Sequence, residues 1–117
     1  MTWEIVSYQD ERGRQPVNDF IANLPPKDQA RVYWTLDLLR EFGLKLGMPY
    51  ARPVHGRLWE LRVPSGRRAY RIFYFAHTRR RFVLLHAFQK KTRKTPRREL
   101  AVAEQRLAEV LARIEEE

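Results

Sequence analysis

The residues best suited to chemistry in this chain are cations gathered in one short stretch. Residues 84–88 form an apolar run, and six cations follow within nine residues: Lys90, Lys91, Arg93, Lys94, Arg97 and Arg98. Thr95-Pro96 then predicts the start of a helix, because Thr is a good N-cap and Pro suits the first helical position. Arg97 and Arg98 would oppose the positive end of the helix dipole, a conflict that favours an anion-binding site over a solvated loop.

A second candidate is a single arginine in the strongly apolar stretch AYRIFYFA, residues 69–76. A buried guanidinium without a partner would be very costly. Arg71 therefore forms an ion pair with Glu60 on a neighbouring strand, or opens onto a groove and binds a phosphate bidentately, and both can hold together. Arg62 shares a strand face with Glu60, so the three form a charged constellation if Arg71 lies on that face.

Cations without metal ligands suit the cleavage of RNA by its own 2′-hydroxyl. That reaction needs in-line orientation, neutralisation of the developing phosphorane charge, and proton transfers. The candidates for charge neutralisation are Arg62, Arg71, Lys90 and Lys91. Glu60, a histidine, or a lysine with a depressed pKa could transfer the protons, and the residues alone leave these alternatives open.

Further residues could bind RNA around such a centre. His55 and Arg57 precede the first of three expected neighbouring strands and could line a rim. The basic stretch adds Arg93, Lys94, Arg97 and Arg98. Phe88, and with a weaker case Tyr74, could stack on bases. His86 lies inside an apolar run, which favours a hydrogen-bonded core residue over a catalyst.

Composition narrows the functional class. The 117 residues suit one domain, 1–117, and 23 Lys and Arg against 14 Asp and Glu give a net charge of +9. Such a surplus favours polyanionic partners: RNA, DNA or an acidic protein. The chain has no Cys, and we find no long apolar span or signal peptide, which fits a cytoplasmic protein. The three histidines are not spaced as ligands, so no metal and no other cofactor is expected.

An α+β domain of order β-α-α-β-β-β-α must position these residues. The expected strands are 3–8, 58–63, 69–76 and 82–88, and the expected helices are 17–24, 27–42 and 96–115, with a loop at 44–56. Pro25-Pro26 joins the first two helices into a hairpin packed on the sheet. The strands at 69–76 and 82–88 are too apolar to have one wet face, which predicts a central position. The apolar stripe of the last helix fits packing on its own domain better than binding to a partner.

Three segments carry a family resemblance: LWELR (58–62), AYRIFYF (69–75) and VLLHAFQKKTRKTPRRELAVAEQRL (83–107). They resemble the RelE/HigB (RelE/ParE) superfamily of type II toxins, most closely the phage-derived Gp49-like branch of HigB. The resemblance implies a RelE-like fold with a twisted antiparallel sheet, an N-terminal helical hairpin and a C-terminal helix. It also implies a metal-independent, ribosome-dependent endoribonuclease that cleaves mRNA and inhibits translation. The implied partners are mRNA on the ribosome and a cognate antitoxin, commonly a helix-turn-helix HigA-like protein.

The residues match the family pattern only in part. The family's strand arginine falls on Arg71, the arginine closing the preceding strand on Arg62, and its basic pair on Lys90 and Lys91. Glu60 stands where the RelE branch has a lysine, and no tyrosine follows Tyr74, whereas RelE has one in its C-terminal segment. These departures resemble a HigB-like site more than a RelE-like one. The alternatives are a ParE-like toxin that acts on DNA gyrase without nuclease activity, and a basic RNA-binding module without catalysis.

Overall fold

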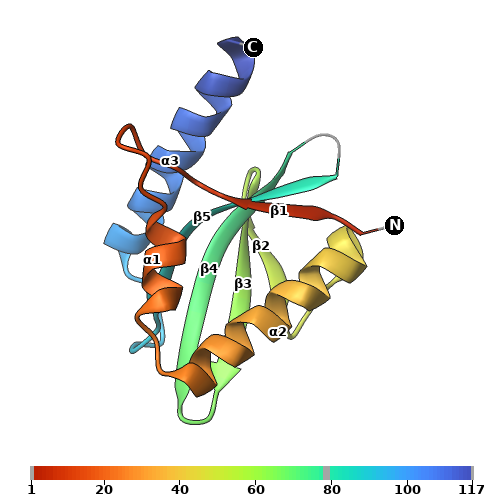
Figure 1. The fold of residues 1–117 in the computed structure, drawn as a ribbon, viewed down its shortest axis with the longest axis vertical. Coiled ribbons are helices and arrows are strands. Elements are labelled where there is room, and N and C mark those ends of the chain that lie inside the picture. Colours follow the sequence, from red (N-terminus) through yellow and green to blue (C-terminus); the bar gives the residue numbers. More distant parts are fainter. Residues whose placement is uncertain (1, 78–79, 117) are drawn as a thin grey trace.

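The computed structural model describes residues 2–77 and 80–116. Its elements are, in order, β1 (Glu4–Ser7), α1 (Pro16–Ala22), α2 (Pro26–Phe42), the 3-10 helix η1 (Gly43–Lys45), β2 (Ala51–His55), β3 (Leu58–Ser65), β4 (Arg68–His77), β5 (Arg81–Gln89) and α3 (Arg97–Glu116) (Figure 1). The predicted α+β class is confirmed. The sequence also predicts a turn at 77–80, which falls partly outside the described residues, since these omit 78 and 79.

The five strands form one sheet in the order β1-β5-β4-β3-β2. Strands β2 to β5 pair antiparallel with one another, and β1 pairs parallel with β5 at the other edge. Strands β4 and β5 lie inside the sheet, which confirms the prediction from their apolar composition. In Figure 1, α1 and α2 lie over one face of this sheet.

Strand β2 corrects the sequence prediction, which assigned residues 44–56 to a loop. Ala51–His55 pairs with β3 and forms an edge of the sheet. Pro53 cannot donate a backbone hydrogen bond, but an edge strand tolerates it because one side of the strand needs no partner. The register also shifts between Pro53 and His55, as at a β-bulge. His55 therefore lies at the end of a strand rather than in a loop.

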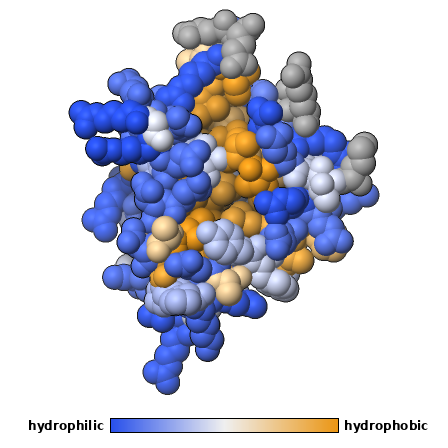
Figure 2. Space-filling view, in the orientation of Figure 1, coloured by the Kyte–Doolittle hydropathy of each residue, from blue (hydrophilic) through white to orange (hydrophobic). Residues whose placement is uncertain are grey.

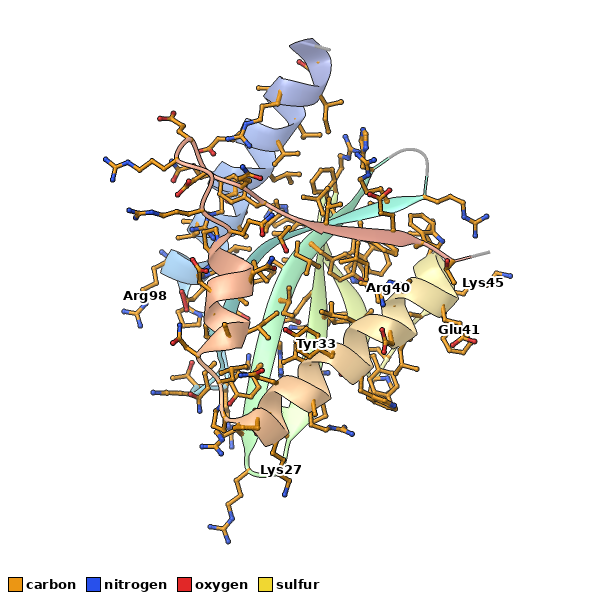
Figure 3. All side chains as sticks on the ribbon, in the orientation of Figure 1. Lys27, Tyr33, Arg40, Glu41, Lys45 and Arg98 are labelled. Atoms are coloured by element: carbon orange, nitrogen blue, oxygen red, sulfur yellow. The ribbon has the colours of Figure 1, made fainter. Side chains whose placement is uncertain are left out.

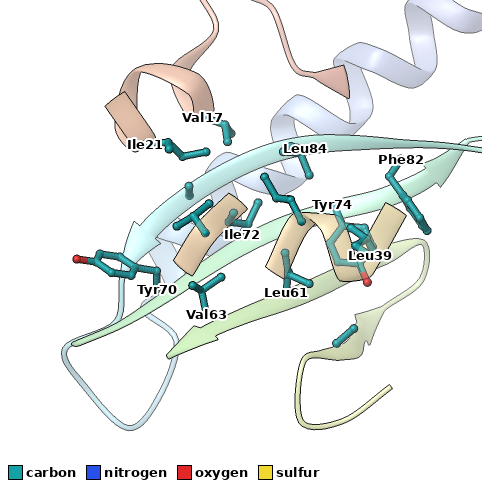
Figure 4. Close-up of a cluster of buried hydrophobic side chains, with 14 of the residues drawn as sticks. Val17, Ile21, Leu39, Leu61, Val63, Tyr70, Ile72, Tyr74, Phe82 and Leu84 are labelled. Atoms are coloured by element: carbon teal, nitrogen blue, oxygen red, sulfur yellow. The ribbon is translucent and has the colours of Figure 1, made fainter. Parts of the chain in front are cut away.

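Two buried clusters hold the layers together. The first joins the helical hairpin to one face of the sheet, with Val17 and Ile21 of α1 packed near Leu84 (Figure 4). The second lies on the other face, where α3 packs through Ala103 and its apolar neighbours. The expected alternation along β3 holds, since Leu61 belongs to the first cluster and Leu58 to the second. The stripe of α3 thus packs on its own domain, as predicted.

The ends of the helices differ slightly from expectation. Helix α3 begins at Arg97, one residue later than predicted, and the Pro96 carbonyl accepts hydrogen bonds from the amides of Glu99 and Leu100. No helix that the structure describes is long and apolar enough to cross a membrane.

Gly43 ends α2 with φ of 59°, and a Cβ there would lie 2.3 Å from Trp3 Nε1. Only glycine suits this close approach, which fixes the start of the chain against the end of α2.

A buried carboxylate attaches the start of α2 to the β3–β4 hairpin. One oxygen of Asp28 accepts a hydrogen bond of 2.6 Å from the Ser65 hydroxyl. Its other oxygen accepts one from the Tyr70 hydroxyl and lies 2.9 Å from Arg68 Nε. The bonds from Ser65 and Tyr70 lower the pKa of Asp28, while burial and this carboxylate raise the pKa of Tyr70 to about 12.

We expect Asp28→Ala to destabilise the protein, because it leaves buried hydroxyls without an acceptor. The melting temperature should fall by about 10 °C or more, whereas Ser65→Ala, which removes one of the bonds, should cost about half of that or less. Thermal unfolding followed by circular dichroism measures both. Equal melting temperatures for Asp28→Ala and wild type would show that the network does not hold α2 in place.

Candidate active site

The β3–β4 register brings the predicted charged residues together. Arg62 lies opposite Arg71, and residues opposite each other in an antiparallel pair share a face. Glu60 is two residues from Arg62 and therefore points to the same side. Arg71 therefore lies on the same face as Glu60 and Arg62, as the predicted charged constellation requires. This is the face of the sheet that α3 covers.

Glu60 joins the arginines of this face. Its side chain is 1% exposed, with Oε2 2.6 Å from Arg52 Nε and Oε1 3.3 Å from Arg71 Nε. Arg71 is 7% exposed, and its Nη1 also donates to the Tyr70 carbonyl at 3.1 Å. Burial lowers the pKa of Arg71, and the charge of Glu60 opposes that effect. The ion pair expected for Arg71 therefore exists.

Arg52 is a site residue that the sequence analysis missed. It lies on β2 directly opposite Glu60, and about half of its side chain is exposed. The only signal for it was the short stretch Ala51–His55 between Gly47 and Gly56, which Pro53 makes hard to recognise as a strand. Arg52 consequently adds a solvent-accessible guanidinium, anchored at one end by a buried carboxylate.

Lys90 completes the group. It follows β5, its amide donates to the Ala69 carbonyl at 2.8 Å, and its ammonium donates to the Arg93 carbonyl at 2.9 Å. Partial burial lowers the pKa of Lys90, and the charge of Arg71 lowers it further. Lys90 is thus a lysine with a depressed pKa, one of the alternatives that the sequence left open. We refer to Arg52, Glu60, Arg62, Arg71 and Lys90 as the charged cluster.

A small cavity of about 180 Å³ lies beside the charged cluster. Glu60 and Arg52 line one part of it, and Thr95 and Leu100 bring the start of α3 to another. The cavity is large enough for a group of a few atoms and has both apolar and charged walls. Helix α3 therefore forms part of the candidate site and does more than cover the sheet.

His86 connects α3 to β5 next to the site. Its Nε2 lies 3.0 Å from Glu99 Oε1, and its Nδ1 lies 3.3 Å from Arg106 Nη1. Because arginine can only donate, Nδ1 must accept, so Nε2 carries the proton given to Glu99. Burial lowers the pKa of His86, against the opposing effect of Glu99. This network is the hydrogen-bonded structural role that the sequence predicted.

The predicted stacking residues lie in the core. Phe88 is 5% exposed and packs between Phe73 and His86, so its ring is closed to a nucleic acid base. Tyr74 is buried on the opposite face of the sheet, and burial raises its pKa. The alternation of side chains identified faces correctly but did not show that α3 and the helical hairpin cover them.

The remaining predicted residues lie around the charged cluster or away from it. His55 pairs with Glu104 of α3, and Arg57 lies over the Phe75 ring at 5.3 Å. Arg57 precedes Glu60 by three residues, about 10 Å at roughly 3.3 Å per residue, and its guanidinium donates to the Ala76 carbonyl rather than to the cluster. Five exposed cations form a basic rim beyond Lys90: Lys91, Arg93, Lys94, Arg97 and Arg98.

Figure 3 shows Arg98 of this basic rim pointing away from the body of the protein. Within residues 2–77 and 80–116, no three His, Asp or Glu side chains converge in a way that could hold a metal ion. The geometry thus offers a partly desolvated group of cations around one carboxylate, with further cations beyond it.

Residues 19–108 match a family model described as phage derived protein Gp49-like (DUF891). The chain belongs to the Gp49-like family. This is a RelE/HigB-like toxin family, and the matched span contains every member of the charged cluster. No curated protein matches the chain.

The contribution of the buried Glu60–Arg71 ion pair to the free energy of unfolding can be measured with a double-mutant cycle. We expect Glu60→Gln to lower the free energy of unfolding by about 3 kcal/mol, because Arg71 then stays buried without a carboxylate. The same change in an Arg71→Met background should cost at least about 1 kcal/mol less. Urea unfolding of the four proteins gives the coupling, and strictly additive costs would contradict the pairing.

The state of His86 predicts a dependence of stability on pH. The folded protein holds its pKa below 6.5, so the unfolded chain takes up the proton first as the pH falls. The free energy of unfolding should therefore fall as the pH drops below about 6.5. The part of this fall due to His86 ends once the pH is below the pKa of His86 in the folded protein. His86→Gln, which does not titrate, should show a shallower decline between pH 7.5 and 5. Parallel curves from urea unfolding would refute this assignment.

Proposed function

We propose that this protein is the toxin of a type II toxin–antitoxin module and acts as a ribosome-dependent endoribonuclease on mRNA. The observation that carries the proposal is the charged cluster, in which buried Glu60 holds two arginines beside Arg62 and Lys90. Membership of a RelE/HigB-like toxin family and the net charge of +9 support it.

The proposed reaction uses the RNA itself as nucleophile. The 2′-hydroxyl gives its proton to a water molecule as its oxygen attacks the adjacent phosphorus, the bond from phosphorus to the 5′-oxygen breaks, and a 2′,3′-cyclic phosphate and a 5′-hydroxyl result. Arg71 and Arg62 neutralise the phosphorane charge, where prearranged cations act without reorganisation. Lys90 protonates the leaving 5′-oxygen, and a lowered pKa makes its ammonium group a stronger proton donor.

Glu60 has a positioning role in this proposal. Its oxygens face Arg52 and Arg71, and at 1% exposure the carboxylate is closed off from a 2′-hydroxyl. The steps described need no metal ion. The basic rim binds the phosphates of mRNA and ribosomal RNA, and Lys91 belongs to it rather than to the reacting centre. A cognate antitoxin, for which we infer a helix-turn-helix HigA-like protein, would silence the toxin by covering this surface.

The test is to induce the protein in bacterial cells without antitoxin and to map RNA 5′ ends across the transcriptome. We expect growth arrest and new 5′ ends confined to translated reading frames. Arg71→Ala should reduce cleavage by about 100-fold or more, since it removes charge stabilisation in a partly desolvated site. Lys90→Ala with Lys91→Ala should also reduce it strongly.

The matched control is Arg12→Ala with Arg14→Ala, which removes two cations from the exposed loop between β1 and α1 and should leave cleavage unchanged. Growth arrest with intact mRNA would contradict the nuclease and direct attention to DNA gyrase. Full cleavage by Arg71→Ala would contradict the assignment of the site.

A further inference from the structure

An exposed pair of aromatic rings lies at the β2 edge of the sheet. Trp34 of α2 is 43% exposed, and its ring meets that of Tyr50 edge to face at 5.8 Å between centroids. Tyr50 directly precedes β2 and is half-buried, and Met48 nearby is largely exposed. Apolar groups that gather at the surface with polar residues around them are often sites at which another molecule binds.

Cations lie at both ends of this group. The Arg31 guanidinium carbon is 4.7 Å from the Trp34 ring centroid, and Arg31 Nε donates to the Pro64 carbonyl. At the other end, Arg62 Nη1 lies 3.9 Å from the Met48 sulfur. We call Arg31, Trp34, Met48 and Tyr50 the aromatic edge. Its positive ends suit a polyanion that carries flat rings.

The aromatic edge meets the charged cluster at Arg62, around the edge of the sheet, since Trp34 belongs to α2 on the face opposite α3. The backbone amide of Arg62 donates to the Tyr50 carbonyl at 2.7 Å, and its side chain reaches Met48. The same residue lies opposite Arg71 in the β3–β4 ladder. A strand of nucleic acid with one phosphate at Arg71 would therefore pass Arg62 on its way to the rings.

We propose that the aromatic edge is a base-stacking subsite for nucleotides of single-stranded RNA next to the scissile phosphate. The inference rests on the proposed function and adds the shape of its substrate to it. Aromatic side chains stack on unpaired bases of any sequence, and neighbouring arginines bind the phosphates between them. Paired bases cannot reach the rings in this way, so the subsite selects single-stranded RNA.

Tyr33 provides a matched control on the same helix. It is 52% exposed, yet it lines a different groove together with Ile21 and Leu36. Figure 3 shows Tyr33 on α2, and Figure 2 shows apolar side chains gathered in the hollow of this face. Tyr33→Ala therefore removes a ring of similar exposure from α2 without touching the aromatic edge.

The experiment measures binding of the purified full chain to a labelled 12-nucleotide RNA by fluorescence anisotropy. The probe carries 2′-O-methyl groups, which prevent cleavage. We expect Trp34→Ala to weaken binding by about five-fold or more, Trp34→Phe to restore most of it, and Tyr33→Ala to leave it unchanged. A second probe of equal length, with sugars and phosphates but no bases at its central positions, should bind wild type and Trp34→Ala equally.

Two results would overturn the inference: unchanged binding by Trp34→Ala, or equal losses with the probe that lacks bases. Either would leave the aromatic edge to a protein partner. Trp34→Phe keeps a ring of similar shape, so its recovery separates lost stacking from lost folding. This result is independent of the test of nuclease activity. If the protein cleaves mRNA but Trp34→Ala binds RNA normally, only the stacking subsite is contradicted. If Trp34→Ala weakens RNA binding but the protein does not cleave mRNA, only the proposed nuclease activity is contradicted.

Discussion

The candidate site depends on one buried carboxylate between two guanidinium groups. Removing an ion from water costs several kcal/mol, and only well-placed opposite charges offset that cost. Glu60 meets this requirement because Arg52 and Arg71 face it, and Arg71 stays in an apolar strand because Glu60 faces it. Since the three residues come from β2, β3 and β4, their pairing also fixes how these strands meet.

Arginines held in place by other residues bind phosphate at a lower entropic cost than flexible surface arginines. A guanidinium already held in place loses little entropy when it binds a phosphate, and it does not need to reorganise while charge develops. Helix α3 is also held in place, since His86 of β5 is bonded to Glu99 and Arg106 of this helix. These bonds keep the start of α3 beside the cavity. The residues that hold the fold thus also hold the site.

Sequence patterns predicted the parts of the site that follow from strong local constraints. Arg71 stood out because a lone charge in an apolar strand demands a partner, and the short connection between the expected strands 58–63 and 69–76 made Glu60 and Arg62 its neighbours. Arg52 could not be found, since a five-residue edge strand containing Pro53 leaves little periodicity. Phe88 was placed on the correct strand, but the covering of its face by α3 is a tertiary contact that no local pattern encodes.

The order of the strands gives the proposed RNA a direction. Lys90 follows β5, Arg71 lies on β4, Arg62 on β3 and Arg52 on β2, so the cations succeed one another across the sheet. Neighbouring strands are about 4.8 Å apart, so these four positions span roughly 14 Å in the direction across the strands. The basic rim lies beyond the β5 end of this row, and the aromatic edge lies at its β2 end. In the proposed function, an RNA strand that contacts both crosses the strands and passes Arg71 on the way.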